Sequence, residues 1–198
     1  MRLGARNLTG AALVLSLAAA CVAVLYAIRP PDYRCDEALQ SLLVDVVEFP
    51  PGSSASTPSA LAGLETNTGA GTRACETNYS GPFGHAFNIL RQYDDEEAAR
   101  RAYSQLVDRV FQVTPEYDLP FSESPVIAAA AIHADEVRAG CTDRLGMGPQ
   151  CAVLARYGRL VSLFQSEMSP SGITADYLVR ILERMDTTVA GSGMEDPQ

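Results

Sequence analysis

Four cysteines beyond the apolar N-terminal segment are the residues whose type and spacing point most clearly to a chemistry. Of the five cysteines in the chain, these are Cys35, Cys75, Cys141 and Cys151. Four cysteines allow three disulfide pairings. The simplest geometry closes the Gly- and Pro-containing loop between Cys141 and Cys151 and leaves Cys35 to bond Cys75. Because disulfides persist in oxidising compartments, we predict two disulfides in an extracytoplasmic domain, with free thiols or a metal as the alternatives.

The two histidines do not add a recognisable catalytic or metal centre to these cysteines. No cysteine pair has the separation typical of zinc sites, and His85 and His133 lie in different predicted elements. A Cys–His nucleophile needs a free thiolate, which disulfides would exclude. We therefore interpret both histidines as structural and predict no catalytic residue, no metal and no cofactor, so that the chain is not an enzyme.

A run of four acids, Asp94-Asp95-Glu96-Glu97, is the other group that could hold a ligand. A calcium loop of the EF-hand type needs alternating oxygen ligands over about twelve residues with a central glycine, which this run lacks. Acidic side chains are favourable at the start of a helix because they complement its dipole. Asp94 and Glu97 also have the spacing of a capping box. We interpret the run as a helix start.

Charge is distributed unevenly along the 198 residues, which carry a formal net charge of −9. All 24 acidic residues follow Pro31, whereas Arg2, Arg6 and Arg29 precede it and no lysine occurs. The resulting acidic domain is unsuited to nucleic acid, whose phosphates need a basic surface. It is equally unsuited to lying on an anionic membrane surface.

The segment Leu8–Ile28 contains no charged residue and is long enough to cross a bilayer as a helix. Arginines precede it, which favours an N-terminus in the cytoplasm. We therefore predict a single-pass membrane anchor with the C-terminal domain outside the cytoplasm. A signal peptide cleaved after Ala18-Ala19-Ala20 and a lipoprotein modified at Cys21 are the alternatives.

The hydrophobic pattern beyond the anchor predicts three helices. One follows Asp36, a good N-cap, and ends at the Phe49-Pro50-Pro51-Gly52 segment. The second runs from the acid run to about Phe111 with one apolar stripe. The third covers about residues 175–188, after Thr174 as its cap.

Four strands are predicted by alternation or by short apolar runs. They cover residues 84–93, 134–141, 150–157 and 159–168, with Gly158 in the turn between the last two. Residues 52–82 are rich in Gly, Ser, Thr, Ala and Pro, which predicts a long loop or weak edge strands. Residues 126–132 fit either a buried strand or a helical turn.

These elements predict an α+β fold. We expect an antiparallel sheet of about four or five strands with helices packed on it, preceded by one N-terminal transmembrane helix. The predicted organisation is a cytoplasmic stub and anchor at 1–31, an extracytoplasmic domain at 32–189 and a disordered tail at 190–198.

The order of elements, the F-P-P-G segment and the anchor together resemble membrane-anchored extracytoplasmic domain proteins of bacteria, many of them uncharacterised. Over about residues 35–189 the chain is similar to the sensor domains of anchored actinobacterial kinases, and to PsbP-like sandwiches. The resemblance implies an extracytoplasmic location and transfers no site residue.

These features predict a binding or sensor-like domain attached to the membrane through its N-terminal helix. The ligand, a small molecule or a protein, is not identified by the sequence. The loops at 52–82, 112–125 and 142–149 are the expected contact surfaces, because loops on a rigid scaffold carry function. A structural or assembly subunit of a cell-envelope membrane complex is the alternative, and a hydrolase with an unrecognised site is less favoured.

Overall fold

The computed structural model describes residues 35–60, 71–82, 84–112, 121–122, 124, 127, 130, 132–144, 148–169 and 172–192. The predicted anchor, with Cys21, lies outside these residues, and no helix within them is long and apolar enough to cross a membrane. The elements are α2 (Glu37–Gln40), the 3-10 helix η1 (Val46–Glu48), β1 (Ser54–Ala55), β2 (Gly71–Gly81), β3 (Gly84–Tyr93), α3 (Glu96–Val110), β4 (Glu136–Arg144), β5 (Gly148–Tyr157), β6 (Leu160–Glu167) and α5 (Ala175–Gly191).

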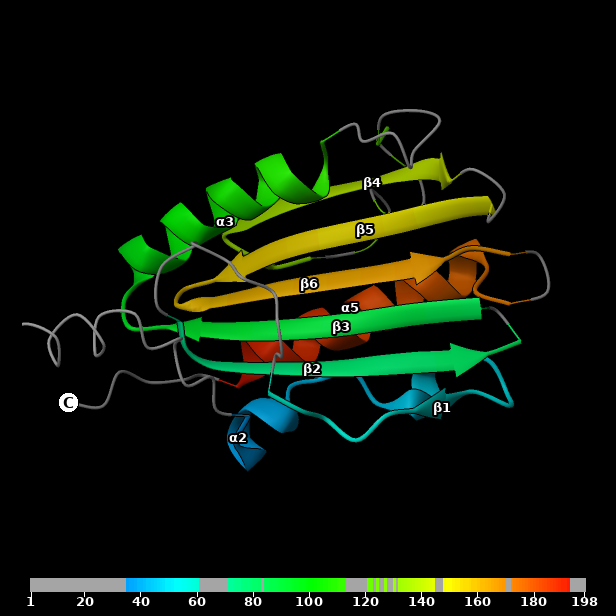
Figure 1. The fold of residues 1–198 in the computed structure, drawn as a ribbon, viewed down its shortest axis with the longest axis horizontal. Coiled ribbons are helices and arrows are strands. Elements are labelled where there is room, and N and C mark those ends of the chain that lie inside the picture. The colour runs from blue at the N-terminus through cyan, green and yellow to red at the C-terminus, as the bar shows by residue number, and fades with distance from the viewer. Residues whose placement is uncertain are drawn as a thin grey trace, which may run out of the picture. The chain divides into compact units, whose positions relative to one another are not determined.

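The described strands form one six-stranded sheet in the order β1-β2-β3-β6-β5-β4. Every neighbouring pair is antiparallel. The predicted α+β class and antiparallel sheet are therefore confirmed, but the expected four or five strands are too few. Figure 1 shows α5 behind the sheet and α3 on its other side, along β5.

The additional strands, β1 and β2, both come from residues 52–82, which favours the strand alternative over the long loop for these parts of the segment. Strand β2 pairs along its whole length with β3, from Gly71 opposite Tyr93 to Gly81 opposite Gly84. Its inward positions, such as Cys75 and Tyr79, are buried. Because its outward positions are polar and small, its apolar pattern is too sparse for the sequence to decide between a loop and a strand.

The predicted helix after Asp36 is only one turn long. Asp36 caps α2 as predicted, since its carboxylate accepts the backbone N–H of Leu39 at 2.9 Å. The three residues Leu42, Leu43 and Val44 are then buried in succession. A helix turns consecutive side chains in different directions, so burial of all three requires the chain to leave the helical path.

Two hydrogen bonds from distant parts of the chain hold Val44 in this non-helical path. Its backbone N–H donates to the side-chain oxygen of Asn88 at 3.3 Å, and its carbonyl accepts the hydroxyl of Tyr79 at 2.6 Å. Burial raises the pKa of Tyr79 well above its usual range, and the charge of Asp45 adds to this. At Val44, hydrogen bonds to residues distant in sequence therefore replace the backbone hydrogen bonds that a continued helix would make.

The start of α3 differs from the prediction by one residue. Asp95, and not Asp94, is the N-cap, and its carboxylate accepts the backbone N–H of Ala98 at 2.7 Å. Glu97 pairs with Arg101, one turn further along the helix, at 3.3 Å, and also with Arg100 at 2.9 Å. The helix then buries one apolar stripe against the sheet.

The last helix is longer than predicted. Thr174 occupies the N-cap of α5 but makes no capping bond through its side chain. The helix continues to Gly191, so Ala190 is helical although the sequence places it in the tail. Between α3 and β4, the backbone N–H of Ile127 donates to the carbonyl of Ser124 and that of Ala130 to the carbonyl of Ile127, at 3.1 Å each, as in a turn. Residues 126, 128, 129 and 131 of the predicted strand or helical turn lie outside the described residues.

Apolar side chains are buried on both faces of the sheet. On one face Phe164 packs with Leu178 and Ile181 of α5, and on the other Leu154 packs with Leu106 of α3. The sheet is therefore packed on both faces, and the turns between its strands lie at the ends of this packed layer.

Candidate functional site

Both predicted disulfides are present in the structure. One bond joins Cys35 to Cys75 and the other joins Cys141 to Cys151. The first ties the start of the domain to β2, and the second links directly opposite residues of β4 and β5. All four cysteines are thus structural, and none can act as a nucleophile while it is oxidised.

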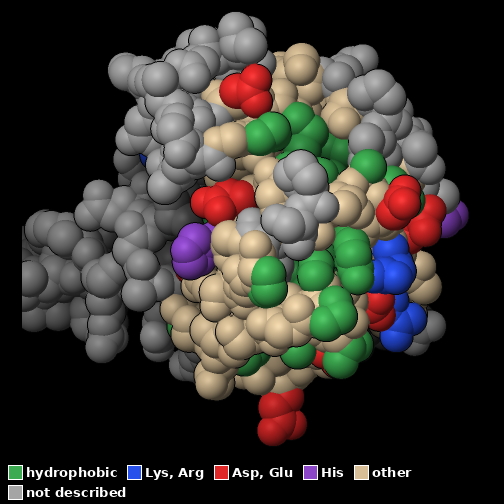
Figure 2. All heavy atoms as spheres, turned by 90° about the vertical axis from the view of Figure 1, so that its right-hand side faces the viewer, with side chains coloured by type: hydrophobic (Ala, Val, Ile, Leu, Met, Phe, Trp, Pro, Cys, Tyr) green, Lys and Arg blue, Asp and Glu red, His purple; other side chains and the backbone are tan. Residues whose placement is uncertain are grey.

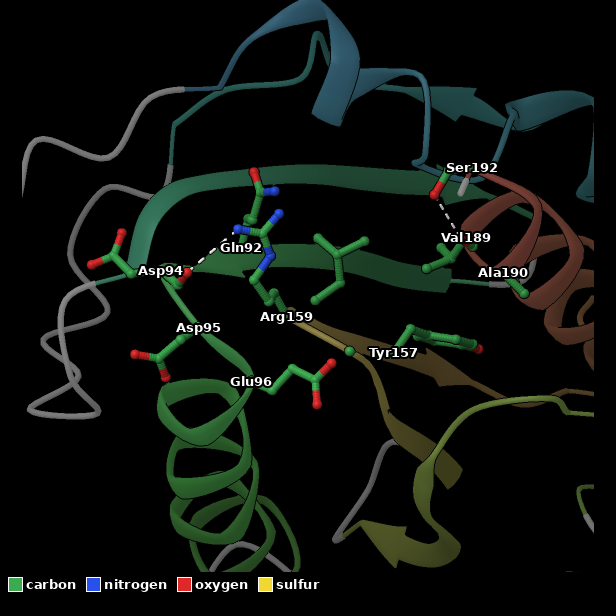
Figure 3. A pocket seen from close by; sticks show the side chains of 11 residues that line it. Gln92, Asp94, Asp95, Glu96, Tyr157, Arg159, Val189, Ala190 and Ser192 are labelled. Carbon is green, nitrogen blue, oxygen red and sulfur yellow. Dashed lines mark hydrogen bonds between the residues drawn. The ribbon is translucent and has the colours of Figure 1, made fainter. Parts of the chain in front are cut away.

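A cavity of about 560 Å³ lies at one end of the sheet. Four parts of the chain line it: the end of β3, the start of α3, the β5–β6 turn and the end of α5. Figure 3 shows these segments surrounding it. We call it the turn-end cavity. Figure 2 looks onto the opposite end of the sheet, where hydrophobic side chains are mixed with acidic, arginine and histidine side chains.

The acid run contributes to the turn-end cavity as well as to the helix. Asp95 is engaged in the cap, but the side chain of Glu96 points across the cavity toward the β5–β6 turn (Figure 3). Arg159 enters from that turn, and its guanidinium donates to the carbonyl of Asp94 at 3.4 Å. The cavity therefore holds a carboxylate and a guanidinium on different walls, which the dipole interpretation of the run did not predict.

The β5–β6 turn that carries Arg159 is held firmly. Gly158 has φ +54°, a left-handed conformation that glycine adopts without strain. Its N–H donates to Asp135 at 2.7 Å, and its carbonyl accepts from Arg156 at 3.0 Å. The predicted turn at Gly158 is thus confirmed and has a fixed position at the mouth of the cavity.

Arg156 connects this turn to α3 through ion pairs. Its side chain is only 6% exposed and pairs with Glu136 at 2.6 Å and with Asp135 at 3.2 Å. Glu136 also lies 3.8 Å from Arg100 of α3. A buried guanidinium needs such partners because leaving it unpaired would be very costly.

The wall of the cavity continues into a buried polar network centred on Asp186 of α5. This aspartate is only 1% exposed, and its carboxylate receives three hydrogen bonds. The Tyr157 hydroxyl donates at 2.9 Å. The backbone N–H of His133 donates at 2.7 Å, and its ring Nδ1 lies 2.7 Å from the second carboxylate oxygen. Asp186 therefore connects the cavity wall to the segment that precedes β4.

The environment of Tyr157 keeps its hydroxyl protonated. Burial raises the pKa of Tyr157 well above its usual range, and the charge and hydrogen bond of Asp186 raise it further. The hydroxyl is therefore a fixed donor to Asp186 at any physiological pH. The bond to Asp186 thus holds the Tyr157 side chain in position at the cavity wall.

Of the two histidines, only His133 joins this network. His85 lies exposed at the start of β3, where its backbone N–H donates to Glu167 at 3.1 Å. His133 is held by a buried carboxylate, as the base of a hydrolytic triad is. Its Nε2, however, hydrogen-bonds to no hydroxyl or thiol in the part of the chain that the structure describes.

The sequence interpretation missed Asp186, although one signal was available. Apolar residues of the last helix, among them Leu178, Leu182 and Met185, recur at helical spacing, and Asp186 follows four residues after Leu182 on the same face. An acid on an apolar stripe is an anomaly, because a buried carboxylate needs hydrogen-bond partners. Its partners come from residues far away in sequence and could not be named.

Among the described residues of the expected contact loops, none lines the turn-end cavity. Residues 71–81 of the first loop are strand β2, and residues 142–144 and 148–149 of the third belong to β4 and β5. Most of the 112–125 loop lies outside the described residues. The cavity is instead formed by the ends of regular elements and by the tight β5–β6 turn.

These observations define a class: an α+β domain with one antiparallel sheet, two disulfides and a charged cavity at the sheet end. No protein-family model matches the chain, and no curated protein matches it. Among solved structures, the extracellular domain of PknH from Mycobacterium tuberculosis is similar, with 10% identity and a TM-score of 0.50 over 81% of this chain and 99% of that domain.

A GTP binding regulator from Thermotoga maritima is also similar, with 13% identity and a TM-score of 0.40, over 79% of this chain and 90% of that protein. The likeness to the PknH domain agrees, at the level of fold, with the resemblance to sensor domains of anchored kinases. The resemblance to PsbP-like sandwiches stays a prediction.

Proposed function

We propose that this chain is a non-enzymatic, sensor-like binding domain, which the apolar N-terminal segment anchors to the membrane and exposes outside the cytoplasm. The two disulfides support the location, because such bonds form in oxidising compartments. The four cysteines offer no thiolate nucleophile while they remain in disulfides, which supports binding over cysteine-based catalysis.

The observation that carries the proposal is the turn-end cavity. A cavity of about 560 Å³ has the size of a small-molecule site. It brings Glu96 and Arg159 together from two different elements. Glu96 suits an ammonium group, and a guanidinium suits a carboxylate. We therefore take the ligand to be a small molecule that bears both groups, with Tyr157 and Val189 supplying less polar walls.

The experiment is a thermal melt of the full chain with three matched compounds at 10 mM. The compounds are L-leucine, N-acetyl-L-leucine, which lacks the ammonium, and L-leucinamide, which lacks the carboxylate. A ligand present at about ten times its Kd stabilises by about 1.4 kcal/mol, which should raise Tm by roughly 3–6 °C in a protein of this size. We expect this shift with L-leucine and a smaller one with each blocked form.

Variants then locate the site. E96Q should abolish the shift with L-leucine, whereas D108N, at an exposed acid farther along α3, should leave it unchanged. No shift in the wild type, or an equal shift in E96Q, would contradict the proposed ligand class. Absence of any shift together with a membrane protein that co-purifies in fixed stoichiometry would favour the assembly-subunit alternative.

A further inference from the structure

The Asp186 network joins two parts of the domain that are far apart in sequence. Tyr157 ends β5 and lines the turn-end cavity, whereas His133 lies in the segment that enters the edge strand β4. Both donate to the same carboxylate on α5. A change in the strength of these bonds must therefore act on the cavity wall and on the edge-strand segment together.

The charged groups of the neighbouring elements are engaged elsewhere. Arg156 of β5 pairs with Asp135 and Glu136, and Arg100 of α3 lies near Glu136 and Glu97. On α5 itself, Arg184 lies 3.7 Å from Glu48. Within the described ranges, His133 is thus the one base at ion-pair distance from Asp186.

The orientation of His133 allows it to gain a proton without opening the network. Nδ1 faces Asp186, whereas the side chain as a whole is 74% exposed. The neutral ring can donate Nδ1–H to the carboxylate while Nε2 takes up a proton from solvent. Imidazoles ordinarily titrate between pH 5 and 8. Proton uptake then turns the Nδ1–H bond into a charge-assisted one, which is about twice as strong.

We infer that His133, Asp186 and Tyr157 form an acid-strengthened latch, which makes the turn-end cavity responsive to external pH. Its role in ligand binding rests on the proposed function, but the latch itself does not. When His133 is protonated, the imidazolium holds the segment before β4 against α5 and keeps Asp186 oriented toward Tyr157. When the ring is neutral, the same contacts persist with a weaker bond at Nδ1.

The chain offers a matched control, because it contains only two histidines. In the full-length protein, H133Q removes the latch base, whereas H85Q removes the exposed histidine of β3. We expect Tm of the wild type, relative to H133Q, to rise by roughly 2–4 °C between pH 7.5 and 5.5. H85Q should follow the wild type. The same pH response in H133Q as in the wild type would overturn the latch.

A second measurement needs no variant and covers the case in which H133Q fails to fold. The backbone N–H of His133 donates to Asp186, so its hydrogen exchange reports the latch directly. After correction for the intrinsic pH dependence of exchange, we expect at least threefold stronger protection at pH 5.5 than at pH 7.5. Unchanged protection while the His133 ring titrates by NMR would exclude the latch.

The two proposals fail independently. L-leucine binding is measured at both pH values in the wild type and in E96Q. If no compound binds at either pH but the His133-dependent response is present, the proposed ligand class fails and the latch stands. If L-leucine binds in the wild type, is lost in E96Q and is equally strong at both pH values, with no change in His133 protection, the function stands and the latch fails.

Discussion

At the residue scale, the polar groups of the domain interior are located where distant segments meet. Asp186 on α5 receives bonds from β5 and from the segment before β4. Asn88 of β3 accepts the backbone N–H of Val44, which belongs to the segment after α2. Because a buried polar group without a partner costs about 1–3 kcal/mol, each of these side chains fixes the relative position of the segments it joins.

Tyr103 provides a pH-dependent prediction at this scale. Burial raises its pKa to about 12, and the nearby charge of Glu136 contributes in the same direction. The unfolded chain ionises this phenol near pH 10, so between about pH 10 and 12 the unfolded state loses its proton first. The contribution of Tyr103 to the free energy of unfolding is therefore fully present below pH 10 and is lost as the pH rises toward 12.

The measurement compares urea unfolding of the wild type and Y103F at pH 9 and pH 11. The chain contains no lysine, and arginine keeps its charge, so tyrosines dominate titration in this range. We expect the wild type to lose about 1 kcal/mol more than Y103F between the two pH values. Equal losses in the two proteins would show that the Tyr103 phenol is not protected by folding.

At the element scale, the start of α3 tests which acid of the run caps the helix. Asp95 accepts the backbone N–H of Ala98, so D95A should lower the free energy of unfolding by about 1 kcal/mol. Asp94 makes no capping bond through its side chain in the structure, and D94A should cost less than about 0.5 kcal/mol. Urea unfolding of both variants decides the matter. A larger loss of stability in D94A than in D95A would instead support Asp94 as the capping residue, as the sequence predicted.

The two disulfides make a second prediction about elements. They close loops with sequence separations of 40 residues for Cys35–Cys75 and 10 residues for Cys141–Cys151. In the chain-entropy account, the longer loop stabilises more, by about 4 against about 3 kcal/mol. C35A/C75A should therefore lower the urea midpoint more than C141A/C151A does. The reverse order would mean that the direct link between β4 and β5 acts through the folded sheet.

Elements with a strong local pattern were predictable, and elements that depend on distant partners were not. Strand β3 and helix α3 agree with the sequence because their apolar residues recur at the right period. Strand β2 has small and polar outward positions and is defined by its pairing with β3. The predicted helix after Asp36 is too long, because the backbone of Val44 bonds to Tyr79 and Asn88 instead of to a preceding helical turn.

The candidate site follows the same rule. The cysteine pairing was predictable from loop closure, and Glu96 was noticed as part of an acid run. The cavity was not predictable, because it needs the ends of β3, β5 and α5 to meet. His133 was interpreted as structural because the sequence names no partner for it. That partner, Asp186, is 53 residues away along the chain.

At the scale of the whole molecule, the oxidation state of the cysteines connects the fold to its compartment. Four of the five cysteines are joined in two disulfides, which leaves Cys21 as the remaining thiol. A reducing cytoplasm would keep all five thiols free. The number of reactive thiols in protein isolated from cells is therefore a direct test of an extracytoplasmic domain.

The full chain is isolated with free thiols trapped by acid, denatured, and treated with a maleimide before or after reduction. An uncleaved anchor predicts one adduct before reduction and five after, on a chain of full mass. Cleavage before Cys21 gives the same first adduct on a shorter chain, whereas lipidation of Cys21 gives none before reduction and four after. Four or five adducts before reduction would contradict an oxidised, extracytoplasmic domain, because each disulfide in the structure removes two thiols.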